Sequence, residues 1–188
     1  MLHRRSRSAG LVAAAAVAVA LVLPMQSLAA RSGTEPGTWA QGVCSAIVDW
    51  GAVAEAKANG IEKQLTGSLP QARAVLSRFL DEMVKETDRM ITRIDVFGTP
   101  AVKSGTPIRQ RLRTLLVAAR SALRDGRDRA AKLSITDATA FQLGAGKISD
   151  NVDRQFTALG SGFDKLDRNF PSPELDRAVS KSPACAKL

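Results

Sequence analysis

Helical periodicity is the feature that most constrains the fold of this chain. Apolar residues recur at helical spacing along four long stretches, and no stretch shows the sustained alternation of a strand. Ser68 and Thr106 stand where two of these stretches begin, and each is followed by an early proline, Pro70 and Pro107. The expected helices cover residues 38–60, 68–97, 106–133, 136–166 and 174–179. The pattern predicts an all-α fold, an antiparallel four-helix bundle with a short C-terminal helix.

The first thirty residues have the grammar of a secretory signal peptide. Arg4, Arg5 and Arg7 precede an apolar run over residues 9–23. Ser27-Leu28-Ala29 then provides the small residues that a signal peptidase needs at positions −3 and −1 of the cleavage site. The run is shorter than the roughly 20 residues of a spanning helix, and nothing after it is apolar enough to span a membrane. We therefore expect a signal peptide over 1–30 and a secreted product, extracellular or associated with the cell wall. An uncleaved N-terminal membrane anchor is the alternative.

The domain plan follows from the leader and the helices. Residues 31–37 contain two glycines and a proline and are expected to be a disordered lead-in, and residues 38–188 to be the helical bundle domain. Removal of the leader takes three of the 27 Lys and Arg residues and leaves 24 against 18 Asp and Glu, a net charge of +6. It also removes His3, the one histidine, and the chain has no tyrosine. Histidine-based catalysis and histidine-ligated zinc are thereby excluded in the mature protein.

Two cysteines, Cys44 and Cys185, stand near the two ends of the mature chain. In an oxidising compartment such an even pair predicts a disulfide that joins the ends of the domain. A catalytic dithiol is the alternative, although it usually requires a close C-x-x-C motif, which this sequence lacks.

The two ends of the domain also carry a resemblance. The domain opens with Trp39-Ala40-Gln41-Gly42-Val43-Cys44 and closes with Pro183-Ala184-Cys185, and Phe97-Gly98-Thr99-Pro100 ends the second helix. With its W-x-x-x-V-C start and terminal P-A-C, the chain resembles small secreted proteins and lipoproteins of actinobacteria, a group without an assigned activity. The resemblance implies a helical protein of the cell envelope. Unlike the lipoprotein members, this chain has no cysteine near the expected cleavage site.

Five arginines share one edge of the third helix. At 100° per residue they fall within about 60° of one another, beside the apolar face. They are Arg109, Arg113, Arg120, Arg124 and Arg127. Three interpretations follow: a patch for an anionic partner, a solvated helix face, or internal pairing with aspartates of the fourth helix. The aspartates considered are Asp150, Asp153, Asp164 and Asp167.

The other polar motifs give weaker indications of function. Glu82 and Glu86 are an i, i+4 carboxylate pair surrounded by basic residues, which is typical of a charged surface. The aspartates of the fourth helix are spaced along a helix, whereas calcium loops need closely spaced donors on flexible backbone, so no metal site is expected. Trp39 and Trp50 lie three helical turns apart and read as core residues, with stacking on a ligand as the alternative.

The sequence therefore predicts a secreted, non-enzymatic binding module without a cofactor. The expected partner is an anionic envelope polymer or lipid headgroup, held by the arginine edge. Nucleic acid is disfavoured because no aromatic residues are interleaved with the arginines. Two alternatives stay open: a carrier that holds an apolar ligand between its helices, and a cell-wall enzyme that uses two carboxylates across a cleft.

Overall fold

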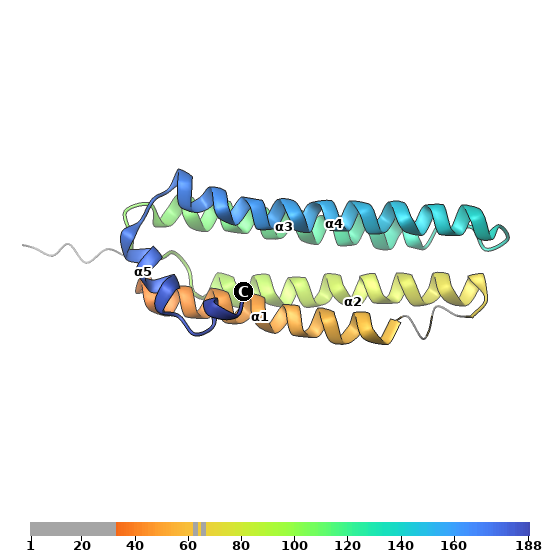
Figure 1. Cartoon of the computed structure of the whole chain (residues 1–188), viewed down its shortest axis with the longest axis horizontal. Coiled ribbons are helices and arrows are strands. Elements are labelled where there is room, and N and C mark those ends of the chain that lie inside the picture. The colour runs from red at the N-terminus through yellow and green to blue at the C-terminus, as the bar shows by residue number, and fades with distance from the viewer. Residues whose placement is uncertain (1–32, 62–63, 65–66) are drawn as a thin grey trace, which may run out of the picture. The chain divides into compact units, whose positions relative to one another are not determined.

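The described part of the protein is entirely helical. The computed structural model describes residues 33–188, except residues 62–63 and 65–66 and the side chains at positions 163, 164, 166 and 167. The expected signal peptide, residues 1–30, lies outside these residues. The described helices are α1 (Pro36–Ile61), α2 (Leu69–Val96), α3 (Gly105–Ala130), α4 (Ala138–Asn169), α5 (Pro173–Lys181) and the short 3-10 helix η2 (Cys185–Lys187) (Figure 1). The all-α prediction is confirmed.

Helix starts follow from local capping chemistry, because the first backbone N–H groups of a helix have no partner within it. At α2 the Ser68 N–H donates to Gln71 Oε1 at 3.0 Å, and a proline occupies the first turn. At α4 the Ala140 N–H donates to Asp137 Oδ1 at 3.0 Å. These are the positions that the sequence marked as starts.

The first helix begins earlier than the sequence analysis expected. Pro36 is already helical, and the Glu35 carboxylate accepts the Thr38 N–H at 2.7 Å, so Glu35 caps the helix in place of Thr38. Thr34 is also ordered, since its N–H donates to the Thr99 carbonyl at 2.7 Å and it forms an isolated β-bridge to the linker between α2 and α3. The described part of the expected disordered lead-in is therefore a structured entry into α1.

Consecutive long helices pack against each other: α1 against α2, α2 against α3, and α3 against α4 (Figure 1). Between α1 and α2, Asp49 pairs with Arg93 and Lys57 pairs with Glu82, both at 2.8 Å. Residue numbers thus rise along one helix while they fall along the other, and the two helices run in opposite directions.

Two apolar clusters fill the interior along the helices. The first lies toward the start of α1 and consists of Trp39, Val43, Ala46, Met90, Ile91, Ile94, Val102, Ile108, Leu112 and Leu116. The second lies toward the start of α2 and consists of Ala72, Leu80, Met83, Val84, Leu123, Ala130, Leu133, Phe141 and Ile148. α2 and α3 contribute to both clusters, α1 contributes to the first and α4 to the second.

The predicted disulfide between Cys44 and Cys185 is confirmed, with the two Cα atoms 5.0 Å apart. It fastens a C-terminal clasp, which we define as α5 and η2 with the residues between them, onto α1. Polar contacts support the attachment, since Ser182 Oγ donates to Gln41 Oε1 at 2.6 Å. Ser182 is buried. The clasp therefore joins the last part of the chain to the first described helix.

Candidate functional site

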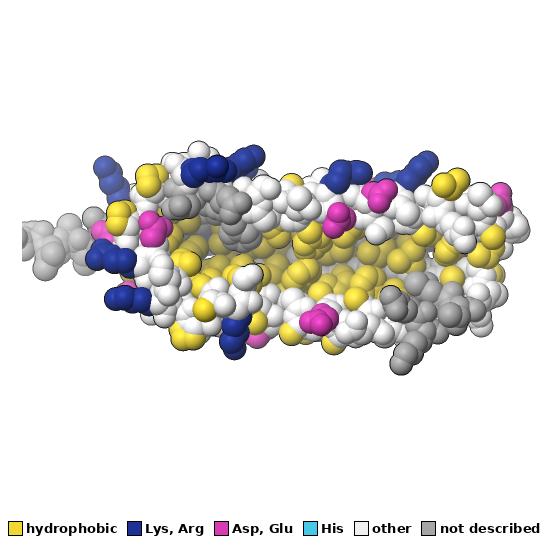
Figure 2. Space-filling model, viewed as in Figure 1, with side chains coloured by type: hydrophobic (Ala, Val, Ile, Leu, Met, Phe, Trp, Pro, Cys, Tyr) yellow, Lys and Arg dark blue, Asp and Glu magenta, His cyan; other side chains and the backbone are white. Residues whose placement is uncertain are grey.

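An apolar groove runs between α1 and α4. Figure 2 shows hydrophobic side chains gathered along a hollow between these two helices. Apolar residues at helical spacing on the inner faces of α1 and α4 are only half-buried, whereas the apolar cluster residues of α2 and α3 behind them are buried. We call this feature the seam groove and define it by Ile47, Trp50, Ala54, Val152, Phe156 and Leu159.

The C-terminal clasp covers only part of the α1 side of the seam groove. Ala40, Cys44, Ile47 and Gly51 follow one another at i, i+4, i+7 and i+11 and so share one stripe of α1. Ala40 is 1% exposed and Cys44 is 8% exposed beneath the clasp. Ile47 is only half-buried, and a Cβ added at Gly51 would have no atom within 4 Å. The stripe is therefore uncovered beyond Cys44.

Two aromatic rings meet across the groove at mid-length. Trp50 of α1 stacks on Phe156 of α4, with ring centroids 5.3 Å apart and an interplanar angle of 14°. The indole is also fixed from the interior, because Trp50 Nε1 donates to Thr87 Oγ1 at 3.1 Å, and Thr87 is 1% exposed. Trp50 packs against both apolar clusters, so the stack stands where the two clusters meet.

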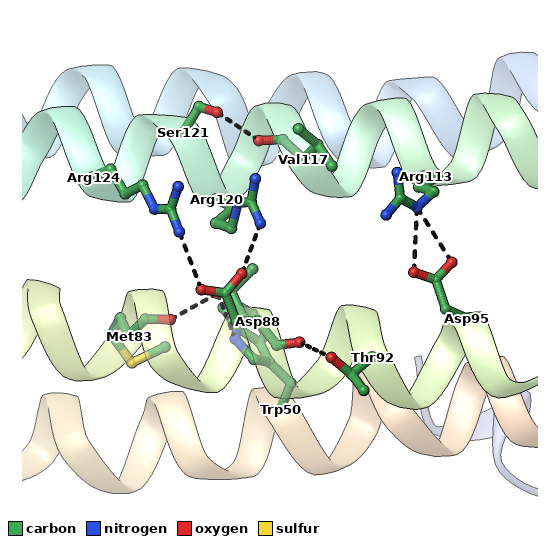
Figure 3. Close-up of polar contacts among 11 residues, drawn as sticks. Trp50, Met83, Asp88, Thr92, Asp95, Arg113, Val117, Arg120, Ser121 and Arg124 are labelled. Atoms are coloured by element: carbon green, nitrogen blue, oxygen red, sulfur yellow. Dashed lines mark hydrogen bonds and ion pairs between the residues drawn. The ribbon is translucent and has the colours of Figure 1, made fainter.

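The arginines of α3 form a ladder of ion pairs with α2. Asp81, Asp88 and Asp95 repeat every seven residues on α2, and Arg113, Arg120 and Arg127 repeat every seven on α3. Seven residues are nearly two helical turns, so each set lies along one edge. The rungs are Arg127–Asp81 at 3.4 Å, Arg120–Asp88 at 2.8 Å and Arg113–Asp95 at 3.2 Å. Figure 3 shows the last two of them. Along this series the residue numbers rise on α2 and fall on α3, so these two helices run in opposite directions.

The remaining two arginines of the edge join the same rungs. Arg124 contacts Asp88 at 3.3 Å, and Arg109 contacts Asp95 at 3.7 Å. All five arginines that the sequence analysis singled out are therefore brought together with carboxylates of α2. We call these contacts the arginine ladder.

Charge coupling at the end of the ladder shifts two pKa values. The pKa of the Asp81 carboxyl is lowered, chiefly by its hydrogen bond with Lys85 and in addition by Arg127. The pKa of the Arg127 guanidinium is raised, chiefly by Asp128 and in addition by Asp81. Both shifts favour the charged forms, so the rung is ionised at neutral pH.

Asp150 and Asp153 of α4, which the sequence analysis considered as partners of the arginine edge, do not pair with it. Asp150 and Asp153 are exposed, and neither has an ion pair among the described residues. The side chains of Asp164 and Asp167 lie outside the described part. The physical reason is that the arginines lie on the edge of α3 that faces α2, where the carboxylates of α2 are within reach.

The other polar candidates are part of the charged surface. Glu82 pairs with Lys57, which lowers the pKa of the Glu82 carboxyl, and Glu86 pairs with Arg89 at 2.7 Å. Within the described ranges no group of His, Cys, Asp or Glu residues is arranged to hold a metal ion. Of the helices that the structure describes, none has the length and apolar character to cross a bilayer.

The α2 aspartates and the seam groove were not predicted from the sequence, although one signal for the ladder is present in it. The seven-residue repeat of the three aspartates matches the seven-residue repeat of three arginines. Matching repeats on adjacent helices are the pattern expected of facing ion pairs. No comparable signal marks the groove, because residues on the inner faces of α1 and α4 look like ordinary core residues.

A charge exchange tests the ladder. We expect Asp88→Arg to lower the free energy of unfolding by about 1 kcal/mol, because it sets a third cation against Arg120 and Arg124. Adding Arg120→Asp should recover most of this loss, since the rung re-forms with reversed polarity. Urea unfolding of the two single variants and the double variant measures the coupling. Strictly additive losses in the double variant would contradict the rung.

The chain has no recognisable relative among the proteins with which it was compared. No protein-family model matches it, and neither a curated protein nor a solved structure does.

Proposed function

We propose that this protein is an exported, non-enzymatic carrier that holds one acyl chain of an amphiphile in the seam groove. The supporting observation is the set of half-buried apolar side chains on both walls of the groove, with the Trp50–Phe156 stack between them. Uncovered apolar surface of this kind on a helical domain is typical of a binding site for an apolar ligand.

The proposed architecture is an antiparallel four-helix bundle with one loosened seam. Consecutive long helices pack closely, and the seam between α1 and α4 is the one left to be filled, because the clasp covers it only as far as Cys44. Sites in helical bundles commonly lie between facing helices, where side chains from several elements converge. The groove is placed accordingly, with buried residues of α2 and α3 as its floor.

The width of the seam favours an acyl chain over a peptide. An α-helix with side chains is about 10–12 Å across, whereas the rings of Trp50 and Phe156 meet with centroids 5.3 Å apart. No helix, from this chain or another, can pass between α1 and α4 at that point. An extended peptide would bury backbone N–H and C=O groups without partners against apolar walls, which is costly. A hydrocarbon chain has no backbone N–H or C=O groups to leave unpaired, and a short one can lie on either side of the stack.

The arginine ladder supports this choice over an anionic patch. Each of its five guanidinium groups already has a carboxylate oxygen at 2.8–3.7 Å. An anionic polymer would have to displace these aspartates, and the groove requires no such displacement. Export is supported by the signal-like leader together with the disulfide, since disulfides persist mainly in oxidising compartments.

Fluorescence tests the carrier proposal. In a Trp39→Phe variant, stripped of bound lipid by denaturation and refolding, Trp50 is the one tryptophan left. We expect parinaric acid, a conjugated fatty acid that accepts energy from tryptophan, to quench Trp50 saturably in the micromolar range, about −8 kcal/mol. Oleate should displace it, because both occupy the same groove.

A matched pair of variants locates the site. Ile47→Asn places an amide in the groove and should weaken binding about tenfold, whereas Val96→Asn changes an exposed apolar residue at the end of α2 and should leave binding unchanged. Absence of saturable quenching in the stripped protein, or equal effects of the two variants, would contradict the proposal.

A further inference from the structure

The two rings that cross the seam groove are held differently. Trp50 is tethered: its indole N–H bonds Thr87 Oγ1 at 3.1 Å, and the Thr87 hydroxyl in turn donates to the Met83 carbonyl at 2.8 Å. Thr87 is buried at 1% exposure, so the tether lies on the floor of the groove. The Phe156 side chain has no polar atom. The contacts described for its ring are the stack on Trp50 and packing against the second apolar cluster.

Each ring has a glycine nearby on its own helix. Gly51 follows Trp50 directly on α1, and Gly160 lies one turn after Phe156 on α4. A Cβ built at either glycine would have no atom within 4 Å, so neither glycine is required by close packing. Within a helix, glycine lowers the equilibrium constant for helix formation about fivefold relative to alanine. Neither glycine therefore contributes a side chain that would hold the Phe156 ring in place.

The stack also divides the groove. Ile47 and Leu159 pack against the first apolar cluster on one side of it, and Ala54 and Val152 pack against the second on the other. An acyl chain shorter than either half can bind without disturbing the rings, whereas a longer chain must pass the stack. Because Trp50 is tethered and Phe156 is not, Phe156 is the ring that yields.

Resting on the proposed carrier function, we infer that Phe156 is a movable gate that sets the chain-length preference of the seam groove. With the ring in place the groove favours short chains. Long chains bind only after the stack has opened, which lowers their affinity by the free energy of the ring pair.

Calorimetric titration with fatty acids from decanoate to stearate tests the gate. Compared with the wild-type protein, Phe156→Ala should shift the ratio of stearate to decanoate affinity about tenfold toward stearate. Gly160→Leu adds a large side chain one turn from Phe156, which should hinder movement of the ring and shift the same ratio in the opposite direction, while Gly160→Ala leaves it unchanged. Phe79→Ala is the control for general loss of packing, since Phe79 packs against the same cluster from α2.

The outcomes separate the inference from the proposed function. A changed ratio in the Phe156 variant, with an unchanged ratio in the Phe79 variant, supports the gate. Binding of all chain lengths with one common ratio in every variant overturns the gate and leaves the carrier function standing. Failure of the wild-type protein to bind any of the fatty acids overturns both. If Phe156→Ala does not fold, the opposite shift in Gly160→Leu decides.

Discussion

Replacing Cys44 and Cys185 together with serine is expected to lower the free energy of unfolding by about 5 kcal/mol. The disulfide closes a loop across 141 residues, nearly the whole described domain, and its removal frees that loop in the unfolded chain. Without it the C-terminal clasp keeps only contacts such as the Ser182–Gln41 hydrogen bond. Urea unfolding followed by circular dichroism measures the loss.

Two controls define the disulfide result. Wild-type protein treated with a reductant should show the same loss as the double variant, because in both the loop is open. Each single serine variant should match them, since either removes the bond. A loss below about 1 kcal/mol would show that the unfolded chain gains little freedom when the bond is absent, contrary to the loop-closure account.

Gly105→Ala is expected to destabilise the protein by about 3 kcal/mol. Gly105 is the buried first residue of α3, and a Cβ there would lie 2.0 Å from the Pro100 carbonyl oxygen and 3.0 Å from Thr99 Cγ2. The first of these atoms belongs to the backbone, so it cannot rotate away as a flexible side chain would. The linker between α2 and α3 must therefore shift, and thermal and urea unfolding report the cost.

Gly146→Ala is the matched control for this prediction. Gly146 is exposed on α4, and a Cβ there would meet no atom within 4 Å. Alanine is the better helix former by roughly 1 kcal/mol, so this variant should be as stable as the wild type or more so. If both alanines had the same effect, the close approach at Gly105 would not be the cause.

Much of the fold could be predicted because its signals are local. Ser68 starts α2 where the sequence placed it, and Asp137 caps α4 within one residue of the expected start at 136, since a cap needs only a short polar side chain and the turn that follows it. The Cys44–Cys185 pairing needed no geometry, because two cysteines allow one intramolecular bond. The start of α1 was less predictable, since the cap is a glutamate and the residue before it pairs with a distant linker.

The candidate site depended on which helices become neighbours, and local pattern does not specify that. The five arginines were recognised as one edge of a helix, but their partners are on α2 and not on α4. Trp50 was expected in the core, with stacking on a ligand as an alternative. In the structure it is half-buried, because it lies on the wall of the seam groove, between the two apolar clusters and Phe156. How far a side chain is covered is a property of the assembled helices.

The arginine ladder specifies direction more strongly than alignment. Because both of its charge sets repeat every seven residues, sliding α3 along α2 by seven residues would restore two of the three rungs. Ion pairing alone therefore allows more than one alignment of α3 along α2. The buried linker resolves the degeneracy, since Pro100 and Val102 are enclosed and Gly105 is seated against the Pro100 carbonyl. The apolar residues of this linker therefore determine the one alignment of α2 and α3 in which their buried residues form the floor of the seam groove.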